Sequence, residues 1–213
     1  MAGGSDGRAG AMVEIVSTVV LAVAAVATAW SGYQASRWHG EQAEAFAHAN
    51  ASRVESTRAS NLANAQSGID VATFSQWVNA YARNETQLAD FYFRRFRAEF
   101  KPAVDAWIAT KPLKNPSAPL TPFAMPQYRL EANAQAERLQ ATAEAASAEA
   151  NSDIQRADDY VLAVVLFSVA LFFSGVSTRM GSPRMRAVVL GIGCVVLLGA
   201  AAWIATFPVS ISV

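Results

Sequence analysis

The sequence predicts an all-α membrane protein: three transmembrane helices, with an extracytoplasmic, coiled-coil-like bundle of three or four helices between the first and second. Three observations predict this class. Long apolar segments occupy residues 12–30, 160–177 and 187–207. Apolar residues make up 53% of the 213 residues, and charged residues only 16%, against about a quarter in ordinary soluble domains. The region between the first two segments is rich in the helix formers Ala, Glu, Gln and Arg.

Each apolar segment is long enough to span a bilayer, because a hydrocarbon core of about 30 Å requires roughly 20 helical residues. The second and third segments contain no charged side chain, and the first contains only Glu14. The expected order is a cytoplasmic tail (1–11), span 12–30, an extracytoplasmic domain (31–159), span 160–177, a cytoplasmic loop (178–186), span 187–207 and an extracytoplasmic tail (208–213).

The basic residues predict the orientation. Arg179, Arg184 and Arg186 lie in the short loop between the last two spans, which has no acidic residue. Such loops stay cytoplasmic, so we expect the N-terminus inside and the C-terminus outside a bacterial inner membrane. Aromatic rings favour the membrane interface, and four of them lie at the outward ends of the spans: Trp30, Tyr33, Tyr160 and Trp203.

Small residues form one face of the first span at helical spacing: Thr18, Ala22, Ala25, Ala29, Gly32 and Ser36. Such a stripe lets another helix approach closely. An alternative is signal-peptidase cleavage after Ala27-Thr28-Ala29, which would remove residues 1–29. The weakly charged leader and the continuity of the stripe favour an uncleaved span.

The outer region is expected to form helices at about 31–67, 70–100, 102–109 and 127–159, with a proline-rich loop over 110–126. Gly68 is the expected C-cap of the first helix, and Asp70 the N-cap of the second. Both ends of this outer region join the membrane, so the chain must run away from the membrane and return to it an even number of times. Either residues 70–109 split into two helical arms, or the proline-rich loop spans the height of the domain in place of a helix. The last helix carries an alanine seam that slips by one residue on entering the second span: Ala132, Ala136, Leu139, Ala143, Ala146 and Ala150, then Ile154, Ala157, Val161 and Val164.

Composition argues against most chemistries. One cysteine excludes an intramolecular disulfide and a cysteine-based zinc site. Seventeen basic and 17 acidic residues leave no excess charge to attract nucleic acid. The sequence has no glycine-rich phosphate loop and no Gly-x-Ser-x-Gly elbow. We therefore expect no enzymatic activity, no cofactor and no metal.

Several residues remain candidates for a more specific role. Glu14 is the only Asp, Glu, Lys, Arg or His in a span, so it is the candidate pore or functional residue. Glu41, Glu44 and His48 share a helix face that could bind a metal, although a solvated face is the simpler interpretation. The segment 91–97 alternates aromatics with arginines, which favours ring packing on an amphipathic helix over contact with lipid headgroups or a partner.

The third span contains Cys194, expected to be a small residue that faces either lipid or another helix. Its glycines Gly191, Gly193 and Gly199 indicate close helix packing, either within the protomer or between protomers.

The segment Trp30-Ser31-Gly32-Tyr33-Gln34-Ala35-Ser36-Arg37 directly follows the first span. With the two closely spaced C-terminal spans, it resembles an uncharacterised family of bacterial three-span membrane proteins, a domain of unknown function. Its members carry a Trp-x-x-Tyr-Gln-Ala segment at this place, usually followed by a basic residue. The resemblance implies an uncleaved first span and no particular activity. From the residues themselves, Gln34 and Arg37 can bond headgroups or cap a crossing helix, and Trp38 is placed to pack near residues 156–160.

Three functions fit these features. The first is a non-enzymatic scaffold in the bilayer that assembles with its own copies or binds another envelope protein. The second is a subunit of an oligomeric ion or solute channel, with Glu14, Ser17 and Thr18 near its inner mouth. The third is an extracytoplasmic sensor, which predicts a ligand pocket among Trp77, Tyr81 and Tyr92.

Overall fold

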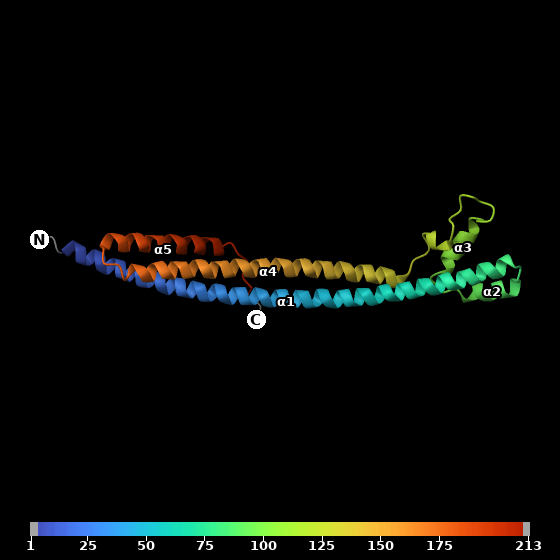
Figure 1. Ribbon diagram of the computed structural model, residues 1–213, viewed down its shortest axis with the longest axis horizontal. Coiled ribbons are helices and arrows are strands. Elements are labelled where there is room, and N and C mark those ends of the chain that lie inside the picture. The colour runs from blue at the N-terminus through green and yellow to red at the C-terminus, as the bar shows by residue number, and fades with distance from the viewer. Residues whose placement is uncertain (1–3, 211–213) are drawn as a thin grey trace. The chain divides into compact units, whose positions relative to one another are not determined.

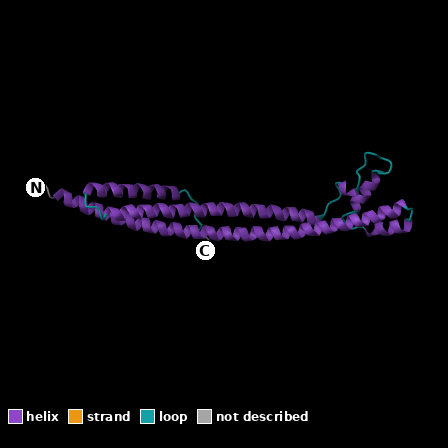
Figure 2. Ribbon diagram, viewed as in Figure 1, coloured by secondary structure: helices purple, strands orange, loops and turns teal. Residues whose placement is uncertain are grey.

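A computed structural model describes residues 4–210, and all regular structure in that part of the chain is helical (Figures 1 and 2). The elements are α1 (Gly4–Ala82), α2 (Thr86–Arg95), α3 (Lys101–Ala109), the short 3-10 turn η1 (Pro122–Ala124), α4 (Glu131–Ser177) and α5 (Pro183–Ile204). The all-α class is therefore confirmed. Parts of both predicted tails, residues 1–3 and 211–213, lie outside the described residues.

Three of these helices, α1, α4 and α5, are long and apolar enough to cross a membrane. The helices α1 and α4 continue well beyond their apolar segments, so each apolar segment and its polar continuation form one uninterrupted helix. The chain divides into two compact units. One contains the described residues up to Ala47 and from Ser147 onward, and the other contains His48–Ala146.

The first unit contains the apolar parts of α1, α4 and α5, and Figure 1 shows α5 folded back beside α4. Val20 and Ala24 of α1 pack with Phe167 of α4 and Leu197 of α5 in one buried cluster. Cys194 is half-buried against this cluster. Its place is therefore a packing position between helices of the same chain.

The helix α1 continues through Gly68 and Asp70, which corrects the predicted break there. Gly68 has ordinary helical geometry, because no glycine among the described residues has a positive φ. A glycine inside a helix costs only about 1 kcal/mol relative to alanine. The buried positions Ala63, Asp70 and Phe74 keep one face through this region, and their packing outweighs that weak local signal.

The true end of α1 lies at Asn84, whose φ of 59° places it in the left-handed region. Asparagine tolerates this conformation and ends helices much as glycine does. The Glu85 N–H donates to the carbonyl of Ala80 at 3.0 Å, which closes the final turn. The helix expected over 70–100 is consequently divided between the end of α1 and the separate helix α2.

The second unit is built around an aromatic cluster rather than an alanine seam alone. Phe74 of α1, Phe96 and Phe100 before α3, and Ala103 and Val104 of α3 are all buried together. The helix α3 begins at Lys101 with Pro102 in its first turn, where a missing N–H costs nothing. Rings from the proline-rich segment complete the cluster, with Phe123 stacked on Phe100 at 5.0 Å.

The alanine seam of α4 is buried at four of its predicted positions: Ala132, Ala136, Ala143 and Ala150. The predicted one-residue slip does not occur, since Tyr160 is buried and Val161 is 46% exposed. Asp153 and Ala157 continue the same face into the apolar part of the helix. A slip is expected when Asp153 and Tyr160 are left out of the seam as polar residues, yet both have polar partners in the structure.

Candidate functional site

The segment that carries the family resemblance forms a polar junction in the first unit. Gln34 is fully buried, and its side-chain amide pairs with the backbone of Ser210 in both directions. Nε2 donates to the Ser210 carbonyl at 3.3 Å, and Oε1 accepts from the Ser210 N–H at 3.1 Å. The Ser210 hydroxyl also donates to Glu41 at 3.4 Å. Gln34 therefore holds the chain beyond α5 against α1 and does not face lipid headgroups.

Tyr160 completes this junction from α4. Its ring is fully buried, and its hydroxyl donates to the carbonyl of Pro208 at 3.1 Å. Phe207 packs edge-on against the same ring at 5.5 Å. The sequence predicts Tyr160 as a membrane-interface anchor. The structure instead places it inside the protein, where it makes a second set of contacts with the segment after α5.

Trp38 lies in the same buried cluster as Ala157 and Tyr160 of α4, where the sequence predicts its partner to be. The guanidinium of Arg156 lies over the indole, 4.7 Å from the ring centroid. The same guanidinium donates to the nearly buried carboxylate of Asp153 at 2.7 Å. The ion pair and the ring contact together explain how a carboxylate is accommodated on the buried face of α4.

The other three predicted interface anchors retain some exposure. Trp30 and Tyr33 are 45% and 53% exposed, with ring centroids 6.0 Å apart. Trp203 is half-buried and packs edge-on against Phe207 at 4.9 Å. Their contact with the lipid interface stays a prediction.

All six residues of the small-residue stripe on α1 are exposed: Thr18, Ala22, Ala25, Ala29, Gly32 and Ser36. The helices α4 and α5 pack instead on the adjacent face, through residues such as Ser17, Val20 and Ala24. Glu14 is also exposed, and it lies one turn before Thr18, whose hydroxyl donates to the Glu14 carbonyl at 3.0 Å. The stripe thus remains uncovered within a single chain.

The glycines of the third span separate into two groups. A Cβ on Gly193 would lie 3.1 Å from the Ser174 hydroxyl and 3.3 Å from the Ala170 carbonyl oxygen, so α4 and α5 approach closely there. Gly191 and Gly199 have nothing within 4 Å of such an atom. The packing at Gly193 is therefore within the protomer.

The arginines predicted to set the topology also differ in their surroundings. Arg179 and Arg184 are exposed, whereas Arg186 donates to the carbonyls of Ser177 and Thr178 at 3.2 and 3.0 Å. These carbonyls end α4 and lack partners within the helix. A cation there also complements the helix dipole, a role that the loop sequence alone does not reveal.

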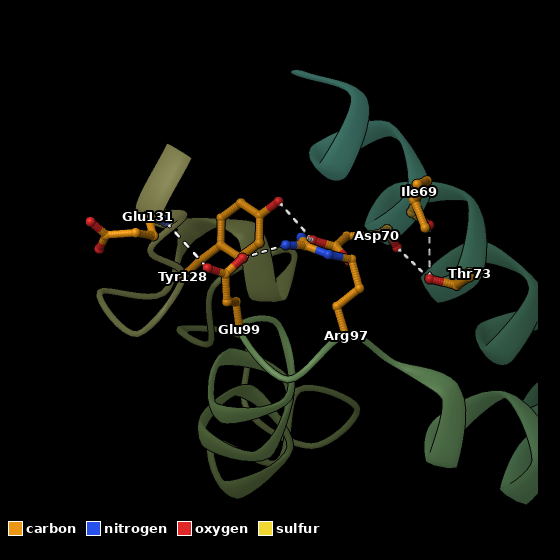
Figure 3. Close-up of polar contacts among 7 residues, drawn as sticks. All are labelled: Ile69, Asp70, Thr73, Arg97, Glu99, Tyr128 and Glu131. Atoms are coloured by element: carbon orange, nitrogen blue, oxygen red, sulfur yellow. Dashed lines mark hydrogen bonds and ion pairs between the residues drawn. The ribbon is translucent and has the colours of Figure 1, made fainter. Parts of the chain in front are cut away.

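A buried charge cluster lies in the second unit (Figure 3). Asp70 is fully buried, and its Oδ2 accepts from Arg97 at 2.8 Å and from the Tyr128 hydroxyl at 3.3 Å. Arg97 also pairs with Glu99, whose other oxygen accepts from the backbone N–H of Glu131 at 3.4 Å. The cluster therefore ties α1 to the chain before α3 and to the first residue of α4.

Burial raises the pKa of Asp70 above its usual value, although the Arg97 guanidinium and the Tyr128 hydroxyl both lower it. Burial likewise raises the pKa of Tyr128. The Oδ1 atom of Asp70 is buried without a hydrogen-bond partner among the described residues. Asp70 is thus a structural acid, where the sequence predicts an N-cap.

The aromatic side chains predicted to form a sensor pocket only partly meet. Trp77 and Tyr81 stack at 5.5 Å and line a groove with Trp107 and Ile108 of α3. Tyr92 is absent from this lining and packs edge-on against Phe91 at 5.6 Å. The guanidinium of Arg95 lies 3.7 Å from the centroid of Phe91. Much of the segment 91–97 therefore makes contacts within the protein.

Glu41, Glu44 and His48 form no metal-binding group, and no such group of three occurs in the described part of the chain. Glu41 instead accepts from Arg37 and Ser210.

No family model, curated protein or solved structure matches this chain. The resemblance carried by residues 30–37 stays a prediction.

Proposed function

We propose that this protein is a non-enzymatic scaffold of the bacterial inner membrane, which assembles through the exposed small-residue face of α1. A single observation carries the proposal: six small residues lie in one stripe on an apolar helix, and neither α4 nor α5 covers them. Small residues let helix backbones approach closely in lipid, where van der Waals contact drives association. In this proposal the residues between the first two spans are extracytoplasmic and present a helical surface to a partner.

The orientation in this proposal rests on two exposed arginines between the apolar parts of α4 and α5: Arg179 in the connection and Arg184 in the first turn of α5. Cationic residues in short loops remain on the cytoplasmic side. The N-terminus is then cytoplasmic, and the segment after α5 is extracytoplasmic. A cysteine-accessibility assay tests this: with Cys194 replaced by Ser, a cysteine at Gly181 should react with membrane-impermeant maleimide only after the cells are opened.

The assembly is tested by native mass spectrometry of the full chain in detergent and in lipid nanodiscs. The wild-type protein should give a defined oligomer. Ala25→Leu should reduce it to monomers, because the added side chain separates the two backbones. Ala202→Leu is the matched control, since it adds the same volume at an exposed position of α5 outside the stripe. A monomeric wild type, or equal effects of both variants, would refute assembly through this face.

A channel is the second candidate, favoured by the position of Glu14. This exposed carboxylate lies on the same helix face as the stripe, beside the exposed Thr18. A closed ring built on that face would bring several copies of Glu14 together near its inner mouth. Planar-bilayer recordings should then show conductance that Glu14→Gln alters, whereas oligomers without conductance would leave the scaffold.

A further inference from the structure

A groove in the second unit plays no part in assembly through α1. Its lining comes from three segments: Trp77, Val78 and Tyr81 of α1, Trp107 and Ile108 of α3, and residues 111–114. The lining is mostly apolar. Val78, Tyr81 and Ile108 nevertheless remain 38–56% exposed, so the chain leaves this apolar surface uncovered.

The walls of the groove are fixed by contacts behind them. The Trp107 indole N–H donates to the Pro119 carbonyl at 2.7 Å, and its ring packs edge-on against Phe74 at 5.5 Å. Trp77 stacks on Phe74 at 5.7 Å and on Tyr81 at 5.5 Å. A ligand entering this groove would therefore find rings already oriented, which reduces the entropy lost on binding.

The segment after α3 contributes two cationic residues to the groove. Lys111 and Lys114 both belong to the lining, and neither forms an ion pair with a described residue. Lys111 has a φ of 54°, in the left-handed region that side chains other than Gly and Asn seldom adopt. A tight turn holds it there: its N–H donates to Ile108 at 2.9 Å and its carbonyl accepts from Lys114 at 2.8 Å.

A second hollow shares Trp77 and Tyr81 with the groove, and its lining includes an acidic residue. Asp90 lines a separate hollow with Asn84 and Thr86, next to Trp77 and Tyr81. The groove itself contains no carboxylate among its lining residues. Its charge is therefore complementary to an anion and unsuited to a cation.

We propose that this groove binds a small organic carboxylate with an apolar, aromatic-sized body. The body lies between Trp77 and Trp107, and the carboxylate accepts hydrogen bonds from Lys111 and Lys114. Apolar walls with a few convergent polar groups are typical of small-molecule sites. This site goes beyond the scaffold function and does not depend on it, because assembly uses residues 18–36 of α1 and the groove uses residues 77–81.

The test is calorimetric titration of the full chain in lipid nanodiscs with naphthoate, with empty nanodiscs subtracted. Naphthylmethanol and naphthylmethylammonium are the matched neutral and cationic probes. Naphthoate should bind saturably at one site per chain, the alcohol about tenfold or more weaker, and the cation not measurably. Absence of saturable naphthoate binding, or equal binding of the alcohol, would overturn the proposal.

Two variants locate the site. The double variant Lys111→Gln, Lys114→Gln should weaken naphthoate about tenfold and leave the alcohol unchanged, with Lys101→Gln as the control on the remaining lysine. Ile108→Glu should abolish naphthoate binding, whereas Leu120→Glu, at a 94% exposed position outside the lining, should not. Circular dichroism establishes that each variant is folded. Unchanged naphthoate affinity in folded groove variants refutes the site, while the oligomer mass tests the scaffold separately.

Discussion

Replacing Gly193 with alanine tests the close approach of α4 and α5 most directly. The new Cβ would meet the Ser174 hydroxyl at 3.1 Å, the Ala170 carbonyl oxygen at 3.3 Å and the Phe173 Cβ at 3.4 Å. The serine hydroxyl can turn aside, but the backbone carbonyl can move only with the helix. Gly199 on the same helix has open space at this position, so it is the matched control.

The magnitude follows from two opposing terms. Alanine stabilises a helix by about 0.5–1 kcal/mol relative to glycine, and both variants gain this amount. Overpacking costs about 1–3 kcal/mol, and only Gly193→Ala pays it. The two variants should therefore differ by about 1–3 kcal/mol, with Gly199→Ala at or above the wild-type stability. Each kcal/mol corresponds to a shift of about 2–4 °C in the thermal midpoint for a chain of this size.

The assay is thermal unfolding in a mild detergent, followed by circular dichroism at 222 nm, a standard helix wavelength, at about matched protein concentration. Gly193→Ala should unfold at a lower temperature than Gly199→Ala and the wild type. If the two glycine variants unfold at the same temperature, α4 and α5 do not meet at Gly193, and the packing of the three spans described above is wrong.

Three further substitutions have predicted outcomes. Gln34→Leu leaves the N–H and carbonyl of the half-buried Ser210 without their partner and should cost about 1 kcal/mol. Carboxypeptidase should then remove C-terminal residues faster, and an unchanged digestion rate would contradict the prediction. Asp70 has a raised pKa, so its contribution to folding is present at low pH and is lost as the pH rises through the folded-state pKa. The thermal midpoint of the wild type minus that of Asp70→Asn should therefore fall between acidic and neutral pH. A rise would mean that the attraction of Arg97 for the ionised carboxylate outweighs the cost of burying that charge. Arg186→Gln should lower the midpoint by the loss of about 1 kcal/mol, and Arg184→Gln should be neutral; equal midpoints would argue against the cap on α4.

The three apolar helices could be predicted because long segments with at most one charged side chain are recognised from local composition alone. The end of α1 could not be predicted, because the local helix-ending signals at Gly68 and Asn84 are of similar size. Gly68 costs about 1 kcal/mol wherever it sits in a helix, and only the burial of Asp70 and Phe74 decides that the helix continues. Asn84 carries the local signal for the real end, yet asparagine is far less specific than glycine at that position.

The polar contacts could be predicted less well than the helices, because their partners are distant in sequence. Gln34 and Ser210 are separated by 176 residues, and no local pattern connects them. Asp153 and Tyr160 interrupt an alanine seam, which favours a slip in phase when only apolar residues are counted. Trp38 is the exception. Its partner on α4 could be predicted, because Trp38 and residues 156–160 both lie close to the same predicted membrane face.

The two faces of α1 lead to a last prediction from adjacent residues. Ala24 is fully buried in the cluster with Phe167 and Leu197, whereas Ala25 is exposed on the stripe. Ala24→Leu should overpack that cluster and cost about 1–3 kcal/mol of stability. Ala25→Leu should change the oligomer mass and leave the thermal midpoint of the isolated monomer unchanged. Substitutions at two adjacent residues should thus affect different properties: stability for Ala24 and assembly for Ala25. If Ala24→Leu instead disrupts only the oligomer, the face assigned to folding is the interface, and the proposed arrangement of α1 is reversed.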